Sequence, residues 1–406
     1  MAEWIQKALG ELTAYMSKGI APKYVGTEGH NTVRVLNQKC NRNFEISYAD
    51  SRIHDLSAKK VPVEKMVSAG DVLINSTGTG TAGRVAQIWN VPSPTIVDGH
   101  MIILRPTSEI CQQFYGYALK LAQGKIEELA EGSTGQTEIN RERLKNEIII
   151  SYPVDIEDQL KVSAFLSNVD EKIKNNAAIN NNLLQQASTI FKHWFTDNPN
   201  LDNMEQVPLA ELCSVVTKGT TPTTLGKPFV SEGINFIKAE SILDNHAIDK
   251  DKFAFIDSET NDLLRRSIIN AGDIVFTIAG TLGRFALIDD SILPANTNQA
   301  VAIIRANQSK ATPEYLYSFF LGNWHNDYYT KRIQQAVQAN LSLGTIKSLP
   351  IPTLSEKAMA DYLGIICPII QMTKANELEI TRLRTMRDAL LPQLMSGELD
   401  VSSLDL

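Results

Sequence analysis

The sequence of 406 residues lacks the patterns that would assign it a catalytic chemistry. Its four cysteines are scattered without a CxxC pair and its six histidines do not cluster, so neither a disulfide framework nor a zinc site is indicated. HExxH, GxSxG and Walker motifs are absent, and we therefore expect no catalytic residues and no metal site. The longest apolar run, 364–370, is far too short to span a bilayer and the start shows no signal peptide, which predicts a cytoplasmic protein without membrane contact.

Positive charge is also scarce. The chain has 39 Lys and Arg against 46 Asp and Glu, a net charge of −7, which taken alone argues against a nucleic-acid-binding protein, because neutralising phosphates needs Lys and Arg. The excess is uneven: residues 151–204 hold seven acidic and four basic groups, and residues 353–406 hold eight and five. If the chain binds DNA, we expect a partner to supply much of the attraction for the phosphates.

What the sequence does contain is a long repeat. KALGELTAYMSKGIAP (7–22) returns as VPLAELCSVVTKGTTP (207–222), AGDVLINSTGTGTAGR (69–84) as AGDIVFTIAGTLGR (271–284), and DGHMIILR (98–105) as NQAVAIIR (298–305). An offset of about 200 residues is too long for a solenoid, whose units span roughly 20–50 residues. The repeat therefore indicates two similar domains.

Each repeat has two parts. The first mixes short β-branched runs with turns and one helix, expected over 115–131 and over 313–335, which indicates a mixed α/β domain. The second part is a long helix. In the first repeat it is expected over 156–195, which contain no Pro or Gly, and its apolar positions follow alternating steps of three and four, as in a coiled coil. The predicted seam residues are Leu166, Val169, Ile173, Asn176, Asn180, Leu183, Ala187, Ile190 and Trp194 in the first helix and Ile366, Ile369, Thr373, Asn376, Ile380, Leu383, Arg387, Leu390 and Leu394 in the second.

Polar residues in these seams suggest that the two helices pair with each other. Asn176 and Asn180 would be costly against an apolar partner but favourable against Asn376, and such pairs fix the register of a coiled coil. Pro368 and Pro392 should lie near the start and the end of the second helix, because proline does not suit a helix interior. The alternative is that each helix is an ordinary amphipathic helix packed on its own domain.

The expected architecture follows from these parts. Residues 1–152 and 201–352 should form two similar α/β domains, and residues 153–200 and 353–406 should form an antiparallel two-helix coiled coil that joins them. An internal pseudo-two-fold axis would relate the two halves.

A glycine-rich turn in the first repeat resembles a nucleotide-binding motif. Gly78, Gly80 and Gly83 form GxGxxG after a predicted strand, which is the dinucleotide-binding pattern. The second copy keeps only GTLGR (280–284), and the residues after the first turn run into prolines instead of a helix. We therefore favour a tight turn between strands whose glycines adopt positive φ, with a nucleotide-dependent enzyme as the less favoured alternative.

Basic and amide side chains at matching places in the two repeats are the candidate DNA contacts. Arg84 and Arg284 follow the glycine turn and could contact phosphate or guanine, or pair with a carboxylate of their own domain. Gln136 and Gln338 could read adenine in the major groove or cap a loop. The other candidates are four lysines beside a shared turn, which could equally be merely solvated, and one asparagine: Lys18, Lys23, Lys218, Lys227 and Asn340.

With these landmarks the chain resembles, over essentially its whole length, the specificity subunit of type I restriction-modification systems. The resemblance is carried by the domain openings EWIQKALGEL and MEQVPLAEL, the strand and turn AGDIVFTIAGTLGR, the loop QANLSLGTIKSLPIP, and the helix ends QQASTIFKHWFTDN and LRTMRDALLPQLMSGEL. Two features depart from it: the second opening lacks an equivalent of Trp4, and the first copy of the loop reads GSTGQTEINRERLK.

The resemblance implies a non-catalytic protein with two target-recognition domains, each reading one half of a bipartite double-stranded DNA sequence, and helices that set the length of unread DNA between the halves. It also implies two methyltransferase subunits as partners, which use S-adenosylmethionine to methylate adenine, and restriction/translocase subunits, with ATP and Mg expected on the partners. This chain itself would bind no cofactor. A coiled-coil scaffold without DNA contact is the alternative.

Overall fold

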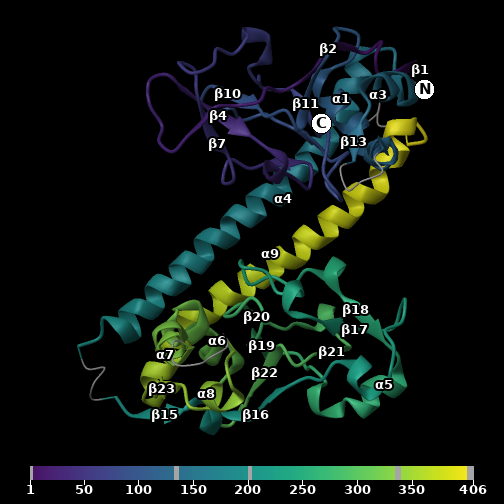
Figure 1. Cartoon of the computed structure of the whole chain (residues 1–406). Helices are drawn as coiled ribbons and strands as arrows, with labels where there is room; N and C mark the ends of the chain where they lie inside the picture. The colour runs from purple at the N-terminus through teal and green to yellow at the C-terminus, as the bar shows by residue number, and fades with distance from the viewer. Residues whose placement is uncertain (1–2, 132–136, 200–203, 334–339, 400–406) are drawn as a thin grey trace. The chain divides into compact units, whose positions relative to one another are not determined.

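The structure, a computed structural model, describes residues 3–131, 137–199, 204–333 and 340–399 (Figure 1). It divides into two compact units. Unit 1 comprises residues 1–172 and 383–406, and unit 2 comprises residues 173–382. Each unit therefore contains one repeat of the α/β part together with a portion of both long helices.

Unit 1 is built from short strands and three short helices that precede the first long helix. In chain order its elements are β1 (Trp4–Ala8), β2 (Thr13–Lys18), β3 (Tyr24–Val25), β4 (Thr32–Leu36), β5 (Asn41–Arg42), β6 (Glu45–Ile46), β7 (Arg52–Asp55), β8 (Val72–Asn75), β9 (Val85–Gln87), β10 (Thr95–Val97), β11 (Met101–Pro106), α1 (Gln112–Leu121), α2 (Gln123–Glu128), β12 (Ala130–Glu131), β13 (Glu138–Ile139), α3 (Arg141–Glu147), β14 (Ile149–Pro153) and the start of α4 (Ile156–Phe191).

Unit 2 follows the same plan. After the end of α4 its elements are β15 (Gln206–Pro208), β16 (Cys213–Lys218), β17 (Ile234–Ile237), β18 (Ala254–Ile256), α5 (Ser258–Leu263), β19 (Ile274–Thr277), β20 (Phe285–Leu287), β21 (Ala295–Thr297), β22 (Val301–Ala306), α6 (Pro313–Leu321), α7 (Trp324–Ile333), α8 (Leu343–Lys347), β23 (Pro350–Pro352) and the start of α9 (Glu356–Ser396).

The main antiparallel sheets of the two units match strand for strand, and the second sheets match in three strands, with β3 as a fourth strand in unit 1. The antiparallel sheet β2-β11-β8-β9 of unit 1 corresponds to β16-β22-β19-β20 of unit 2. A second sheet, β10-β4-β7-β3, pairs β10 with β4 in parallel, and β21 and β17 pair in the same way in the sheet β18-β17-β21. The opening strand of each domain pairs with its last one, β1 with β14 and β15 with β23. The predicted duplication and the mixed α/β fold class are confirmed.

The strand residues of the repeated MIILR and VAIIR segments are buried on both faces of their sheet. In β11, Ile102 and Leu104 pack in the core beneath α1, whereas Met101 and Ile103 pack in a second core on the opposite face. Side chains of a strand alternate between faces, so a continuous apolar run is what a sheet covered on both sides requires. β22 divides its residues between two cores in the same manner.

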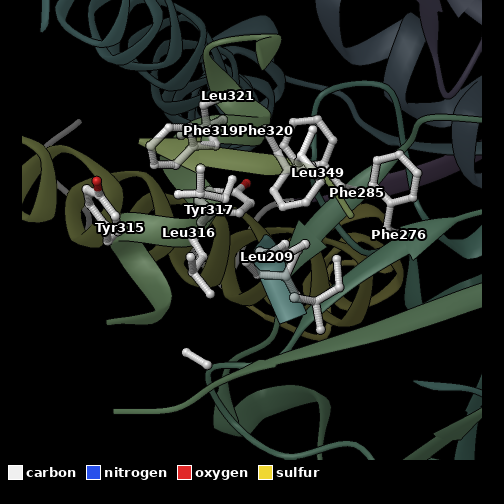
Figure 2. Packing of buried hydrophobic residues seen from close by; sticks show 14 of the residues in the cluster. Leu209, Phe276, Phe285, Tyr315, Leu316, Tyr317, Phe319, Phe320, Leu321 and Leu349 are labelled. Atoms are coloured by element: carbon white, nitrogen blue, oxygen red, sulfur yellow. The ribbon is translucent and has the colours of Figure 1, made fainter. Parts of the chain in front are cut away.

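Aromatic side chains fill the main core of unit 2. α6 directs Tyr315, Phe319 and Phe320 into this core, where Phe320 lies 5.4 Å from Phe276 and 5.6 Å from Phe285 between ring centroids (Figure 2). These tilted ring contacts add to the stabilisation that burial of the apolar area gives.

The helices α4 and α9 pack against each other antiparallel within each unit. In unit 2, Asn180 Nδ2 donates to the carbonyl of Thr373 at 3.0 Å, its Oδ1 accepts from Asn376 Nδ2 at 2.7 Å, and Asn176 Nδ2 donates to Glu379 at 2.8 Å. Lower numbers in α4 thus face higher numbers in α9. Pairing of the two helices and of their asparagines is confirmed, and the alternative of two helices packed only on their own domains is wrong.

The buried seam of α4 differs from the predicted one beyond Asn180. Leu183, Ile190 and Trp194 are half-buried. The predicted position Ala187 is buried, but the other buried positions lie at Phe191 and Phe195, with Leu184 packed against the same core. A π-helical turn over Lys192–Thr196 accompanies this shift. A straight α-helix repeats every 3.6 residues, so it drifts from a strict heptad pattern unless it supercoils.

The second seam drifts in a similar way. The buried residues among the described positions of α9 include the predicted Ile366, Thr373 and Leu394 and also Tyr362, Ile370, Leu391 and Met395. The remaining predicted seam residues are half-buried: Ile369, Asn376, Ile380, Leu383, Arg387 and Leu390.

Three helix boundaries also differ from the sequence-based expectation. Pro368 lies well inside α9 instead of near its start. Ile366 and Ile370, on either side of this proline, are buried and anchor this part of the helix in the core of unit 2. Pro392 lies close to the end of α9, as expected. The expected helix over 313–335 is broken at Gly322, where a Cβ would come within 2.0 Å of the Phe191 ring. The expected helix over 115–131 is likewise two helices, α1 and α2.

Candidate functional site

The repeated Lys-Gly step closes the end of β2 in unit 1 and of β16 in unit 2. A Cβ on Gly19 would lie 2.1 Å from the Val97 carbonyl oxygen, and one on Gly219 would lie 1.7 Å from that of Thr297. Backbone cannot yield that far, so only glycine allows the two segments to approach this closely. The close approach fixes the position of the lysine that precedes each glycine.

A second cation joins the repeated lysine in both units. Lys65 Nζ donates to the carbonyl oxygen of Lys18 at 2.8 Å, and Arg266 Nη2 donates to that of Lys218 at 3.5 Å. Lys18 is also paired with Glu138, and its pKa is lowered by burial and by the positive charge of Arg141. A second basic side chain therefore reaches the backbone of the repeated lysine in each unit. Sequence reasoning missed Lys65 and Arg266, because neither lies within a segment that aligns between the repeats.

The other candidate lysines are in different settings. Lys23 and Lys218 are exposed, and the backbone N–H of Lys23 donates to His54 Nδ1 at 2.8 Å. Lys227 pairs with Glu259 at 2.7 Å, so its charge is partly neutralised inside unit 2.

The two arginines that follow the glycine turns have different partners. Arg284 makes two hydrogen bonds to Asp244, from Nε at 2.7 Å and from Nη2 at 2.8 Å. Arg84 instead donates from Nη2 to the carbonyl of Gly80 in its own turn, at 2.9 Å. The carboxylate partner considered from the sequence is therefore present for Arg284.

Of the three candidate residues with amide side chains, only Asn340 lies within the described part of the chain. Asn340 is exposed at the start of the segment that leads to α8, whereas Gln136 and Gln338 lie outside the described residues.

The glycine turns connect antiparallel strands in both units. Positive φ angles occur at Gly78 (105°), Gly80 (70°) and Gly83 (92°) between β8 and β9, and at Gly280 (75°) and Gly283 (86°) between β19 and β20. A strand follows each turn, so the turn provides no helix N-terminus for the pyrophosphate of a dinucleotide. This geometry removes the basis of the nucleotide-dependent alternative.

An ion pair with a buried carboxylate and a partly exposed arginine explains why the AGD and IIR segments repeat together. Arg105 contacts Asp71 from Nε at 2.8 Å and from Nη2 at 3.0 Å, and Arg305 contacts Asp273 from the same two nitrogens, both at 2.7 Å. The planar guanidinium matches both carboxylate oxygens, which gives the contact a fixed geometry. Asp71 with Arg105 and Asp273 with Arg305 thus hold the sheet of each domain together. We call these four residues, which occupy the same places in both repeats, the frame residues.

The segments between these shared landmarks differ between the units. Tyr24 in unit 1 is 44% exposed, with the Arg52 guanidinium 5.0 Å from its ring centroid. In unit 2, Phe229 is 38% exposed and contacts Phe236 at 5.3 Å between centroids. Residues 23–60 and 223–262 thus present different exposed side chains on a common frame.

Two histidines of unit 2 are part of its core. His246 stacks on Phe285 at 4.0 Å between centroids, and His325 is buried beside Phe276. Burial lowers the pKa of both imidazoles to about 4, with smaller contributions from Lys374 at His246. Across the described residues, no group of three or more His, Cys, Asp or Glu could hold a metal ion, and no helix is long and apolar enough to cross a membrane.

Known proteins resemble this chain over both repeats. The sequence profile of the family described as "Type I restriction modification DNA specificity domain" matches residues 1–185 and again residues 202–382. The "Type I restriction enzyme HindI specificity subunit" of Haemophilus influenzae is 23% identical, over 98% of this chain and 100% of that protein. The MjaIX specificity subunit of Methanocaldococcus jannaschii is 25% identical, over 72% of this chain and 69% of that one.

A solved structure resembles the chain in fold. The S subunit of the type I restriction-modification system from M. genitalium matches with a TM-score of 0.58 and 16% identity, over 97% of this chain and 96% of that one.

Proposed function

We propose that each of the two domains of this chain reads one half of an asymmetric bipartite DNA sequence. The premise is that the chain belongs to the type I restriction-modification DNA specificity family and is a sequence-specific DNA-recognition subunit of such a system. The recognition domains in this proposal are residues 1–152 and 201–352. Residues 153–200 and 353–406, which include α4 and α9, would set the number of unread base pairs between the halves.

The observation that carries this proposal is a common frame with two different exposed segments. The Asp71–Arg105 and Asp273–Arg305 pairs and the sheets around them repeat, so both domains can approach DNA in the same way. Residues 23–60 and 223–262 do not repeat, and base readout depends on which side chains reach the base edges. Two halves of different sequence are the expected target of such a protein.

We further propose that the Lys-Gly step positions each domain on the phosphates. Lys65 reaches the backbone of Lys18, and Arg266 reaches that of Lys218, at equivalent places, and phosphate contacts fix register without reading sequence. Lys23, Arg84 and Asn340 are further candidate contacts, whereas Lys18, Lys227 and Arg284 would have to leave Glu138, Glu259 and Asp244 to bind DNA. Gln136 and Gln338 stay candidates for base contact.

The chemistry would lie on partner subunits. In our proposal the chain is not itself catalytic and assembles with two methyltransferase subunits, which carry S-adenosylmethionine and modify adenine. Restriction/translocase subunits, with ATP and Mg, would cleave unmodified DNA. The net charge of −7 supports this division, because an acidic subunit needs partners that supply phosphate attraction. We also propose a cytoplasmic location, where chromosomal DNA is accessible.

Methylome sequencing tests the proposal. The chain is expressed with its cognate methyltransferase in a host free of adenine methylation, and one bipartite adenine motif with a fixed gap is expected. Replacing residues 1–150 by the first recognition domain of another subunit should change one half of the motif and leave the other half and the gap unchanged. A motif that is insensitive to this exchange would refute two-domain reading.

A control separates a scaffold from a DNA reader. The methyltransferase expressed without this chain should leave the motif unmodified. Modification that persists without the chain would favour the coiled-coil scaffold.

A further inference from the structure

A buried charge network ties the first α/β domain to both long helices in unit 1. Asp170 of α4 accepts a hydrogen bond from Arg387 Nη1 of α9 at 2.6 Å and another from the Tyr117 hydroxyl of α1 at 2.7 Å. Lys120 of α1 lies on the same carboxylate, with Nζ 3.9 Å from Asp170 Oδ2. Three helices therefore meet at one carboxylate.

The network is largely removed from water. The side chains of Lys120, Asp170 and Arg387 are 13%, 18% and 15% exposed. Lys120 Nζ is buried without a hydrogen-bond partner among the described residues and lies 4.6 Å from the ring centroid of Phe44 and 5.7 Å from that of Tyr117. Burial accordingly lowers the pKa of Lys120 to about 8.

Phe44 extends the network into the part of the domain that differs between the repeats. It lies in the turn between β5 and β6, where Asn43 and Phe44 both have positive φ, 53° and 63°. Non-glycine residues adopt this conformation at a cost, so surrounding contacts must hold the turn. The contacts of Phe44 with Tyr117 at 5.6 Å and with Lys120 supply that support.

The residues of this network have uncharged counterparts in unit 2, where the charges beside Tyr317 belong to the Lys374–Glu377 pair, both on α9. At the constant offset of the repeat, Tyr117 corresponds to Tyr317, and Lys120, Asp170 and Arg387 correspond to Phe320, Ile370 and Ala187. These four residues of unit 2 pack together in one apolar core. In unit 1 a carboxylate thus links three helices by directional polar contacts, whereas the four corresponding residues of unit 2 pack in an apolar core and the nearby Lys374–Glu377 pair lies within α9 alone.

Hydrogen-bonded ion pairs and apolar contacts restrict the movement of helices to different degrees. A buried ion pair contributes little stability beyond that of a well-packed apolar replacement, but its hydrogen bonds have fixed directions. Apolar contacts are non-directional and tolerate small rotations and slides of one helix on another. A carboxylate that bonds to α1 and α9 at once allows one arrangement of these helices.

We propose that the Lys120–Asp170–Arg387–Tyr117 network is the positioning element that holds the first recognition domain in one orientation on α4 and α9. The network thereby fixes the distance along the DNA between the first half-site and the second. This inference rests on the proposed function. Adjacent base pairs are about 3.4 Å apart along the DNA axis, so a small slide of the domain is enough to change the unread gap by one base pair. None of the four residues needs to touch DNA for this effect.

Two variants with a matched control test the inference in the complex of the full chain with its methyltransferase. Tyr117→Phe removes one hydrogen bond to Asp170. Tyr317→Phe makes the same substitution at the corresponding position of unit 2, which has no aspartate at the place of Asp170. The triple variant Lys120→Phe, Asp170→Ile and Arg387→Ala installs the residues of unit 2 and keeps the junction apolar. Thermal unfolding and hydrogen exchange over residues 41–46 and 112–121 report whether each variant is folded and whether the junction has loosened.

The readout is the set of adenine motifs modified by each complex. We expect Tyr117→Phe to lower modification of the original motif roughly tenfold, the factor of one lost hydrogen bond to a charged group, while Tyr317→Phe leaves it unchanged. The triple variant should fold and should also modify sites whose gap is one base pair longer or shorter, with the bases of both half-sites unchanged.

Three results would overturn the inference. A folded triple variant with the original gap and rate would show that orientation is set elsewhere. A change in the bases of the first half-site would assign these residues to readout. Equal losses for Tyr117→Phe and Tyr317→Phe would indicate a structural role shared by both units. A wild-type complex that modifies no bipartite motif would refute the proposed function itself, a result distinct from these three.

Discussion

The frame ion pair of unit 2 allows a stability effect to be worked out from its geometry. Asp273 is fully buried, and its carboxylate accepts two hydrogen bonds from Arg305 at 2.7 Å and one from the backbone N–H of Asn270 at 2.8 Å. Arg305→Met keeps a side chain of similar length and removes both charged donors. The remaining backbone donor cannot compensate for a buried carboxylate.

The expected loss is about 3–5 kcal/mol in the free energy of unfolding, as is typical when one partner of a buried pair is removed. Adding Asp273→Asn to Arg305→Met removes the unpaired charge and should recover at least about 1 kcal/mol, a coupling normal for residues in direct contact. Arg265→Met is the matched control, because Arg265 is exposed and such a change stays within about 0.5 kcal/mol.

Urea unfolding followed by hydrogen-exchange mass spectrometry of peptides from residues 271–306 measures these differences in unit 2. Two outcomes would refute the reasoning. One is a loss below about 1 kcal/mol for Arg305→Met, the size of an ordinary exposed pair. The other is a double variant less stable than the single one, which would mean that the arginine contributes through its packing and not through the carboxylate.

Two further predictions concern unit 2. Burial lowers the pKa of His246 and His325 to about 4, so between about pH 6.5 and 4 the unfolded chain binds protons that the folded chain does not. The contribution of each histidine to the free energy of unfolding is therefore complete above about pH 6.5, and falling pH reduces it by up to about 3 kcal/mol within this window. Urea unfolding at pH 7.5 and pH 5 checks this, and a flat profile, or one that His246→Phe leaves equally steep, would contradict it. Asn180→Leu should cost about 2 kcal/mol, because Asn376 Nδ2 and the Thr373 carbonyl lose their partner, and Asn180→Leu with Asn376→Leu should recover part of that loss. A double-mutant cycle by urea unfolding measures the coupling, and additive losses would show that the two asparagines do not act as a pair.

The repeat made much of the fold predictable from the sequence. Two copies of one pattern identify frame residues by comparison, and both the matching sheets and the asparagine pair at Asn180 and Asn376 follow from it. The glycine turn could be assigned correctly because the second copy lacks the third glycine and a following helix. In each case the evidence lay in two places of the same chain.

What the sequence could not provide lies where the repeats differ or where packing overrides local preference. Pro368 is tolerated inside α9 because the helix is held by its buried neighbours, which no local rule reveals. Lys65 and Arg266 reach the Lys-Gly step from segments that do not align. Arg387 was predicted to lie in the seam, but its partner Asp170 was not, since nothing in the spacing of one helix shows which residue of the other faces it.

The division of unit 1 between the two ends of the sequence has a consequence for folding. Its core includes Leu391, Leu394 and Met395 beside Leu9 and Leu144, and Trp4 lies against Gly397. During synthesis from the N-terminus, the first domain therefore leaves the ribosome long before the helix that completes its core exists. Unit 2 consists of one continuous stretch and can finish first. A chain that ends before α9 therefore lacks the residues that complete the core of its first domain, and we expect that domain to be cut by proteases faster than in the full chain.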